Sequence, residues 1–281
     1  MSRLSITIHI DGKIKTVSKG KKATERITNN TTDMINETIR NRRTIRKYSD
    51  KEVTDELIEG LLETSFRAST MENLQLYSVV ITRDGEMKRR LADAHFNQPM
   101  VTEAPVVLTF CADMNRFDRW CRERNAQPGC DNLLSFVNGT IDALLVAQTF
   151  AALAEEQGLG LCYIGTTVYN PEKIIDILGL PRLVFPIATL TVGYPAETPK
   201  QQDRLPLRGL IHREKYSDYD RAAIDDIYAE KEALPESRHF MEINHKETLA
   251  QIYADIRYNK SDIEAISEKL MEVMRTQGFV K

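Results

Sequence analysis

Residues Asn132 to Glu156 constrain the fold more than any other part of the sequence, because they form one long and largely apolar helical pattern. Apolar residues recur around much of its circumference: Phe136, Val137, Ile141, Leu144, Leu145, Phe150 and Leu153. A stripe this broad predicts a central helix that other elements cover on most sides. Its nearly apolar part, from Ala143 to Ala154, is too short to span a bilayer. We therefore expect a globular domain built around this helix.

The composition supports a globular protein of 281 residues, long enough for a full hydrophobic core in one domain. An apolar share of 42% and a charged share of 28% exclude wholesale disorder. A net charge of −3 gives no general attraction to nucleic acid or to an anionic membrane. The first residues lack the continuous apolar run of a secretory signal, and the four cysteines show no zinc-binding spacing. We expect a soluble, cytoplasmic protein with reduced thiols and no metal.

The first 32 residues differ in pattern from the rest of the chain. Ser5 to Val17 alternates polar and apolar residues around Asp11-Gly12, which predicts a β-hairpin. Lys19 to Thr32 is polar and contains Gly20, Asn29 and Asn30, as is typical of a linker. We expect residues 1–32 to be an accessory hairpin and linker, and residues 33–281 to be the main domain with a C-terminal helical extension.

Helical and strand patterns alternate irregularly through the main domain. Strands are predicted at Tyr77 to Thr82, Pro105 to Cys111 and Phe185 to Val192. Thr54 is a predicted N-cap for a helix whose buried face comprises Leu57, Ile58, Leu61, Leu62 and Phe66. Other helices are predicted near Glu86 to Ala94, from the cap Asn170 with Pro171 to Gly179, across the charge-rich Asp218 to Glu232, and after a capping box at Ser261 to Glu264. Because no regular βαβ repeat appears, we expect an α+β fold.

A dense basic segment runs from Arg40 to Tyr48 and reads Arg-Asn-Arg-Arg-Thr-Ile-Arg-Lys-Tyr. It follows a short helical pattern with Asp33 as a plausible N-cap, so its cations lie near the helix C-terminus. Such a cluster is suited to binding a phosphate group. The alternative is that the cations are solvated partners of the helix dipole, which is the common role of basic residues at a helix end.

Glycines at positions 158, 160 and 165 suggest a nucleotide-binding loop, but the spacing excludes the two common types. The segment follows a helix and its third glycine comes too late for a dinucleotide-binding fingerprint. Thr166 stands where a Walker loop requires lysine. Gly158 and Gly160 can simply end the long helix in left-handed conformation. The sequence also lacks H-E-x-x-H and G-x-S-x-G, so hydrolytic and zinc-protease chemistry has little support.

The basic segment, followed by a helix rich in Leu and Ile, resembles the opening motif of the FMN-dependent nitroreductase family. Further segments resemble that family in order along the chain: Ser69 to Gln75, Gln98 with the strand that follows it, Leu161 to Thr166, and Arg204-Leu205-Pro206-Leu207. The resemblance covers roughly Met34 to His212. Two departures stand out, since Met71 and Glu72 replace small hydroxyl residues and Gln202 stands where some relatives carry lysine.

The resemblance implies a role for each motif in binding FMN. Arg42, Arg43, Thr44 and Arg204 would hold the phosphate, and Arg46 and Gln98 would face the pyrimidine edge of the ring. Thr70, Met71, Asn73 and Gln75 would belong to a second flavin loop, usually contributed by the partner subunit. The remaining predicted contacts lie along the flavin face, where backbone N–H groups meet flavin N5: Tyr163, Ile164, Gly165 and Thr166.

The same resemblance implies a nitroreductase-like α+β fold, in which helices flank a central mixed sheet and two chains intertwine as a homodimer. Hydride would pass from NADPH or NADH to flavin N5, and then to a small-molecule acceptor such as a nitroaromatic, a quinone or a free flavin, by a ping-pong mechanism. No side chain need act as a catalytic residue. Two alternatives stay open: a flavin-cleaving or dehalogenating enzyme of this fold, and a non-catalytic FMN-binding protein.

Overall fold

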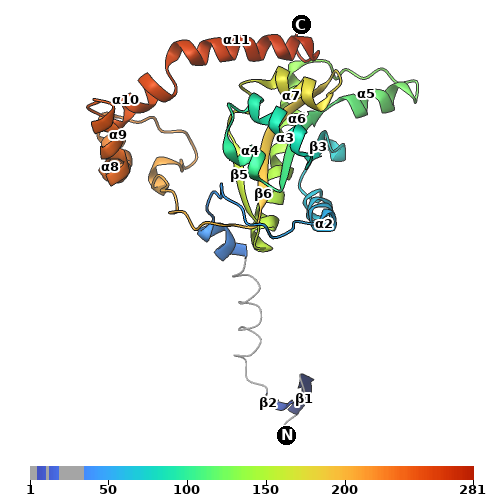
Figure 1. The fold of residues 1–281 in the computed structure, drawn as a ribbon, viewed down its shortest axis with the longest axis vertical. Helices are drawn as coiled ribbons and strands as arrows, with labels where there is room; N and C mark the ends of the chain where they lie inside the picture. Colours follow the sequence, from blue (N-terminus) through green and yellow to red (C-terminus); the bar gives the residue numbers. More distant parts are fainter. Residues whose placement is uncertain (1–4, 11–12, 19–34) are drawn as a thin grey trace.

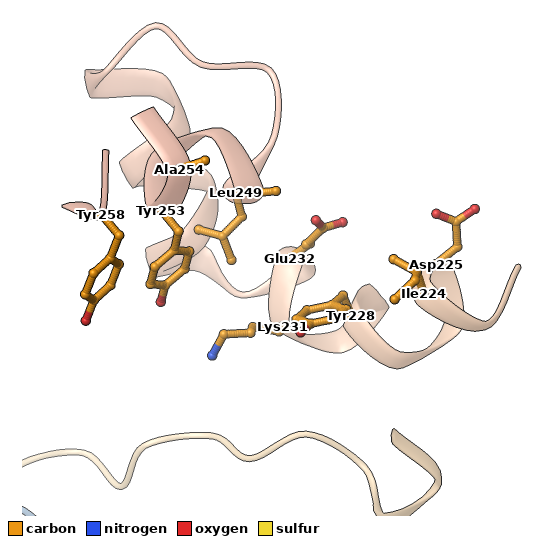
Figure 2. A pocket seen from close by; sticks show the side chains of 10 residues that line it. Ile224, Asp225, Tyr228, Lys231, Glu232, Leu249, Tyr253, Ala254 and Tyr258 are labelled. Carbon is orange, nitrogen blue, oxygen red and sulfur yellow. The ribbon is translucent and has the colours of Figure 1, made fainter. Parts of the chain in front are cut away.

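A four-stranded sheet forms the centre of the protein, seen in a computed structural model that describes residues 5–10, 13–18 and 35–281 (Figure 1). Its strand order is β3-β4-β6-β5, with bounds Tyr77–Thr82, Val106–Asp113, Val184–Gly193 and Gly160–Ile164 respectively. All three strand pairs are antiparallel. Parallel pairing occurs in the described part only at the isolated bridge between Thr44 and Leu161. The predicted mixed sheet is therefore antiparallel apart from this bridge.

The long helix α6, Leu133–Glu156, packs along one face of the sheet together with α2. Asn132 begins it, because its side chain accepts a hydrogen bond from the backbone N–H of Ser135 at 3.0 Å. Phe150 is fully buried and lies 6.1 Å from Phe110 of β4 between ring centroids. α6 is long and apolar enough to cross a membrane by length and composition alone, but this packing makes it a core helix.

The expectation that α6 is covered on most sides is wrong for the single chain. Its outer face carries a row of exposed apolar side chains, of which Ile141 is 43% exposed and Leu144 is 45% exposed. Periodicity reports which faces are apolar, and says nothing of what covers them. This row also includes Leu134, Val137 and Leu145.

Helix α2, Asp55–Ser65, follows the predicted pattern closely. The Thr54 hydroxyl accepts a hydrogen bond from the backbone N–H of Leu57 at 3.2 Å, which confirms the predicted cap. Its buried residues include Ile58, Leu61 and Leu62. Phe66 is 41% exposed, contrary to expectation, because it lies after the helix ends.

Helices α3 (Gly85–Ala94), α4 (Pro99–Glu103) and α7 (Pro171–Leu178) supply apolar side chains to a second core cluster that includes β4 and β5. Gly179 ends α7 with a φ of 62°, as predicted. The Asn170 side chain does not cap α7. It donates instead to the carbonyl oxygen of Ala94 at 2.9 Å, and so ties the start of α7 to the end of α3.

The C-terminal third extends beyond this core as a group of short helices, joined back to it by the long helix α11 (Figure 1). α11 spans Lys260–Thr276 and is capped by Asn259, whose Oδ1 accepts from the backbone N–H of Asp262 at 3.0 Å. The predicted cap at Ser261 is therefore wrong by two residues. The remaining elements are η1 Met71–Asn73, α5 Asn115–Arg122, η2 Leu207–Gly209, α8 Arg221–Ala233, α9 Pro235–Ile243, α10 Leu249–Gln251 and η3 Ile252–Arg257.

The N-terminal hairpin is present as predicted. Strands β1 (Ser5–Ile10) and β2 (Lys13–Ser18) pair antiparallel, with Ile10 opposite Lys13. The two turn residues at 11–12, the linker at 19–32 and the predicted helix start at Asp33 and Met34 lie outside the described residues.

The basic segment docks on the open edge of the sheet beside β5. The backbone N–H of Ile45 donates to the carbonyl oxygen of Leu161 at 3.1 Å, and the Ile45 side chain is 6% exposed. Gly160 makes this docking possible, because a Cβ there would lie 2.5 Å from Ile45 Cγ1. The Tyr48 hydroxyl fixes the end of the segment by donating to the carbonyl oxygen of Ile45 at 2.9 Å.

We predict that Gly160→Ala lowers the free energy of unfolding by roughly 1–3 kcal/mol, because the added methyl group overpacks Ile45. Gly60→Ala is the matched control, since a Cβ at this position in α2 meets nothing within 4 Å. Alanine favours a helix over glycine, so the control is expected to gain about 0.5–1 kcal/mol. Urea denaturation followed by circular dichroism measures both changes. Equal effects of the two substitutions would contradict the docking contact.

Candidate functional site

A cavity of about 320 Å³ lies where the basic segment meets the end of α6. Both cations and carboxylates line it, among them Arg42, Arg43, Glu155 and Glu197. The loop from Gly158 to Gly160 forms part of its wall. Gly158 adopts a φ of 77°, which confirms that it ends the helix in left-handed conformation, whereas Gly160 begins β5 without a positive φ.

Arg42 is already engaged by a carboxylate of the protein. Its Nε lies 3.2 Å from Glu155 Oε1, although the two groups are not aligned as a hydrogen bond. Burial raises the pKa of Glu155 to about 7, and the nearby Arg42 opposes this rise. Arg43 differs, because its buried Nε has no hydrogen-bond partner among the described residues. Of these two predicted phosphate ligands, Arg43 is the one whose guanidinium remains available to an anion.

Thr44 and Arg46 flank the buried Ile45 in an extended segment, so their side chains point away from the core. Glu197 holds this segment in place, because its Oε1 accepts from the backbone N–H groups of Arg46 at 2.8 Å and Lys47 at 3.1 Å. Burial raises the pKa of the Cys162 thiol, and the neighbouring Arg46 guanidinium opposes this rise. Arg46 therefore lies beside β5, as its predicted role requires.

Gln98 and Thr166, two predicted flavin contacts far apart in sequence, meet directly. The Gln98 Nε2 donates to Thr166 Oγ1 at 3.2 Å and to the carbonyl oxygen of His95 at 3.1 Å. His95 Nδ1 lies 3.1 Å from the same Thr166 oxygen. Burial lowers the pKa of His95 to about 4, so the imidazole is neutral at physiological pH.

The other residues of the predicted flavin face differ in exposure. Ile164 is buried at the end of β5, whereas Tyr163 is half-buried and Gly165 is exposed. Burial raises the pKa of Tyr163 to about 12; the nearby Arg42 lowers this pKa, and Glu155 raises it further. A Cβ at Gly165 would meet nothing within 4 Å, so the backbone there borders open space.

The loop from Thr70 to Leu76 is organised by Asp142, a carboxylate in the middle of α6 that is 1% exposed. The backbone N–H groups of Met71 and Leu76 donate to it at 2.9 and 3.0 Å, and the Thr70 hydroxyl donates as well. A buried charge is tolerated when it accepts several hydrogen bonds in this way. Asp142 therefore fixes both ends of the predicted second flavin loop.

The same loop contains strained backbone. Glu72, Asn73 and Gln75 adopt φ values of 49°, 55° and 49°, which are uncommon for residues other than glycine. The Gln75 side chain donates to the carbonyl oxygen and to Oδ1 of Asn73, at 2.6 and 2.7 Å. Both residues line a groove of about 690 Å³ that also contains Arg116. Such strain persists where the surroundings impose it, and it is common at functional sites.

The structure brings the predicted residues together in two groups. The first contains the basic segment, Gln98 and Tyr163 to Thr166; the second contains Thr70 to Gln75. No described hydrogen bond or ion pair joins the second group to the first within one chain. Arg204 joins neither, because its guanidinium donates to the carbonyl oxygen of Asp203 at 2.8 Å, although the nearby Gln201 contacts the carbonyl oxygens of Arg40 and Arg42.

Four residues that shape the site were not predicted from the sequence: His95, Asp142, Glu155 and Glu197. Asp142 carries a visible signal, since it is a carboxylate in the middle of an apolar helix, away from both helix ends. The other three act on residues distant in sequence, and no local pattern identifies them. Among the described residues no cluster of side chains is suited to holding a metal ion.

Comparison with known proteins places these observations in context. The model of the Nitroreductase family matches residues 39–194. An FMN reductase (NADPH) from Bacillus subtilis (strain 168) is 32% identical over 241 residues, covering 85% of this chain and 90% of that protein. Among solved structures, an oxidoreductase from Bacteroides fragilis is 63% identical with a TM-score of 0.86, covering 87% of this chain and all of that one. The NADPH:FMN oxidoreductase from Vibrio harveyi complexed with NAD+ is 26% identical with a TM-score of 0.67, and the match covers 82% of this chain and 97% of that one. These matches confirm the resemblance and the α+β nitroreductase-like fold that it implied.

His95 and Glu155 are expected to act on stability in opposite directions as pH changes. The folded pKa of His95 is lowered from 6.5 to about 4, so the unfolded chain binds more protons between these values and stability rises with pH. The folded pKa of Glu155 is raised from 4.5 to about 7, so stability falls with rising pH across that window. The two effects largely cancel between pH 4.5 and 6.5.

We predict that Glu155→Gln removes the loss of stability that Glu155 causes as pH rises, and so leaves the gain in stability from His95 unopposed. Between pH 4.5 and 6.5 the free energy of unfolding of this variant should climb more steeply than that of the unmodified protein, by about 1 kcal/mol per pH unit. Urea denaturation at several pH values measures the slope, and Glu156→Gln controls for loss of a neighbouring carboxylate. An unchanged slope in Glu155→Gln would show that Glu155 is ionised throughout this range.

Proposed function

The chain belongs to the nitroreductase family, and from this premise we propose that it is an FMN-dependent oxidoreductase that uses NAD(P)H to reduce nitroaromatic, quinone or flavin acceptors. The observation that carries the proposal is the docking of Ile45 on β5. It places the basic segment alongside Gly160 to Thr166. One edge of the sheet therefore holds cations, the accessible backbone at Gly165, and the hydrogen-bonded side chains of Gln98 and Thr166. These are the groups that a flat ring with a phosphate tail requires.

The residues present fit FMN. The buried Arg43 Nε lacks a hydrogen-bond partner among the described residues. The backbone at Gly165 borders open space, and Gln98 and Thr166 offer polar atoms at one point. When bound, FMN supplies hydride acceptance at N5 and onward electron transfer, which no side chain of the protein provides. Thr44, Arg42 and Arg204 are the other proposed phosphate ligands, Arg42 being offset by Glu155.

The protein's own contribution is binding, orientation and charge. Arg46 lies beside β5, and a cation there stabilises negative charge on the pyrimidine edge of the cofactor, which raises its reduction potential. Tyr163 and Ile164 would support the ring, and the peptide N–H groups around Gly165 would face it. No described side chain is needed as a nucleophile or a general acid.

We further propose that two chains form the functional unit. The exposed apolar row on α6 is too continuous for a surface that faces water, and a second copy of the same helix is its best-matched cover. The strained loop, with Thr70, Met71, Asn73 and Gln75, would then complete the partner's flavin site. This arrangement accounts for the separation of the predicted site residues into two groups.

NADPH is the proposed reductant in preference to NADH. Cations in the C-terminal part of the chain are the candidates to contact the 2′-phosphate of NADPH, and most of them already have partners. Arg208 pairs with Asp226, Lys260 lies 3.7 Å from Glu264, and Arg257 stacks 4.8 Å from the Phe240 ring. Arg213 has no ion-pair partner in the described part of the chain, which makes it the leading candidate.

Location and domain organisation complete the proposal. A cytoplasmic location agrees with the cysteines, since Cys111, Cys121, Cys130 and Cys162 are all free. Residues 1–32 are proposed to be accessory, because the match to the family model begins only at residue 39.

Steady-state turnover decides between an oxidoreductase and its alternatives. FMN-loaded protein is expected to oxidise NADPH several times over when a nitroaromatic or quinone is present. A flavin-storing protein would oxidise no more than one equivalent, and an enzyme that consumes its flavin would lose the flavin absorbance during the assay. Either result would refute the proposed activity.

Arg43→Ala is predicted to weaken FMN binding by about 1.5–3 kcal/mol, the range for losing one charge-assisted hydrogen bond. Fluorescence titration of the flavin-free protein with FMN measures the change. Arg40→Ala is the matched control, because Arg40 is an exposed cation of the same segment outside the cavity. Equal affinities for FMN in the two variants would show that Arg43 is only a solvated partner of the helix dipole.

Ile141→Glu is predicted to convert the dimer to monomers, because it places a charge in the centre of the apolar row on α6. Ile141→Val, which keeps the surface apolar, should remain dimeric. Sedimentation velocity gives the mass of each variant in solution. If Ile141→Glu stays dimeric, the two chains associate through another surface.

A further inference from the structure

Thr166 lies between two hydrogen-bonding side chains, and the direction of the first bond can be assigned. The carbonyl oxygen of His95 only accepts hydrogen bonds, so the Gln98 atom 3.1 Å from it must be the amide nitrogen. The same nitrogen lies 3.2 Å from Thr166 Oγ1. The Thr166 oxygen therefore accepts from Gln98.

The second bond depends on which nitrogen of His95 carries the proton. His95 is fully buried, and its Nε2 has no hydrogen-bond partner among the described residues. A proton on Nε2 would be a buried donor without an acceptor, which is rarer in proteins than an unsatisfied acceptor. A proton on Nδ1 instead points at Thr166 Oγ1, 3.1 Å away. Burial also holds the ring neutral, so only one nitrogen carries a proton.

We propose that His95 is a positioning residue that donates from Nδ1 to Thr166, so that the Thr166 hydroxyl proton is directed to a carbonyl oxygen on the polar edge of the flavin ring. A threonine hydroxyl has two acceptor sites and one proton. With Gln98 and His95 filling both acceptor sites, only the proton remains for a ligand. No described residue accepts it. This inference rests on the proposed FMN function.

The backbone between His95 and Gln98 is strained in a way that brings both side chains to Thr166. Phe96 and Asn97, which separate His95 from Gln98, adopt φ values of 56° and 54°. Consecutive left-handed residues that are not glycine cost free energy, and they persist when the surroundings impose them. Here they bring His95 and Gln98, three positions apart, onto one hydroxyl oxygen. Asn170 helps to hold the turn by donating to the carbonyl oxygen of Ala94 at 2.9 Å.

The tautomer of His95 is measurable without flavin. In the flavin-free, full-length protein labelled with ¹⁵N at histidine, a long-range ¹H–¹⁵N correlation spectrum distinguishes protonated from unprotonated ring nitrogens. The signals of His95 are those absent from His95→Asn. We expect a protonated Nδ1 and an unprotonated Nε2. The reverse pattern would overturn the proposal whether or not the protein binds FMN.

Affinity for FMN, measured by fluorescence titration, tests the consequence for the ligand. Thr166→Val keeps the shape and removes the hydroxyl, and should weaken binding about tenfold, whereas Thr166→Ser should stay close to the unmodified protein. His95→Leu should weaken binding by a similar factor, and His95→Asn, whose amide can donate from a position near Nδ1, should recover most of it. The double variant His95→Leu with Thr166→Val should bind no worse than Thr166→Val alone, because His95 acts through Thr166.

Additive losses in the double variant, or unchanged affinity in Thr166→Val, would overturn the proposal. If His95→Leu does not fold, the tautomer and the pair Thr166→Val and Thr166→Ser still decide. Failure of the unmodified protein to bind FMN would refute the proposed function instead, a different outcome from FMN binding that is insensitive to Thr166.

Discussion

The contact between Ile45 and Gly160 determines the arrangement of the site. Because glycine leaves room beside β5, the Ile45 side chain enters the core and its backbone pairs with Leu161. The basic segment is thereby fixed along the open sheet edge beside β5, which ends at Ile164 and leads into Gly165 and Thr166. Residues on either side of Ile45 must face outward, since side chains alternate along an extended segment. One buried apolar contact thus orients the cations that we propose bind the flavin phosphate.

Helix α6 links this edge to the rest of the protein through two of its carboxylates. Asp142 lies at its middle and holds the loop from Thr70 to Leu76, while Glu155 near its end lies beside Arg42. The apolar residues between them divide into a face buried on the sheet and a face exposed in the single chain. A dimer through the exposed face would bring the loop of one chain toward the flavin site of the other. In the proposed dimer, the buried carboxylate, the strained loop and the exposed row would together build a site shared between subunits.

Local patterns in the sequence predicted helices and strands well where a single feature, such as one N-cap residue, marked the element. The strand at Tyr77–Thr82 and the cap at Thr54 were confirmed, because strand preference and side-chain capping are set by neighbouring residues. The predicted start of α11 was wrong because two nearby residues can both cap a helix, and Asn259 does so in place of Ser261. Long-range contacts were beyond local reasoning: the bonds of His95 to Thr166 and of Glu197 to Arg46 join residues 71 and 151 positions apart. The site residues identified by resemblance remain predictions, and only the fold shows that Arg42 lies beside Glu155.

The proposed function requires that this sheet edge holds FMN and that NAD(P)H reduces it. The most direct test is the visible absorbance spectrum of the purified protein, recorded before and after anaerobic addition of NADPH and, separately, of NADH. The account predicts a yellow protein whose flavin bands bleach with NADPH, more slowly with NADH, and return when an acceptor is added. A colourless protein that takes up no FMN on reconstitution, or bound flavin that neither nucleotide bleaches, would contradict it.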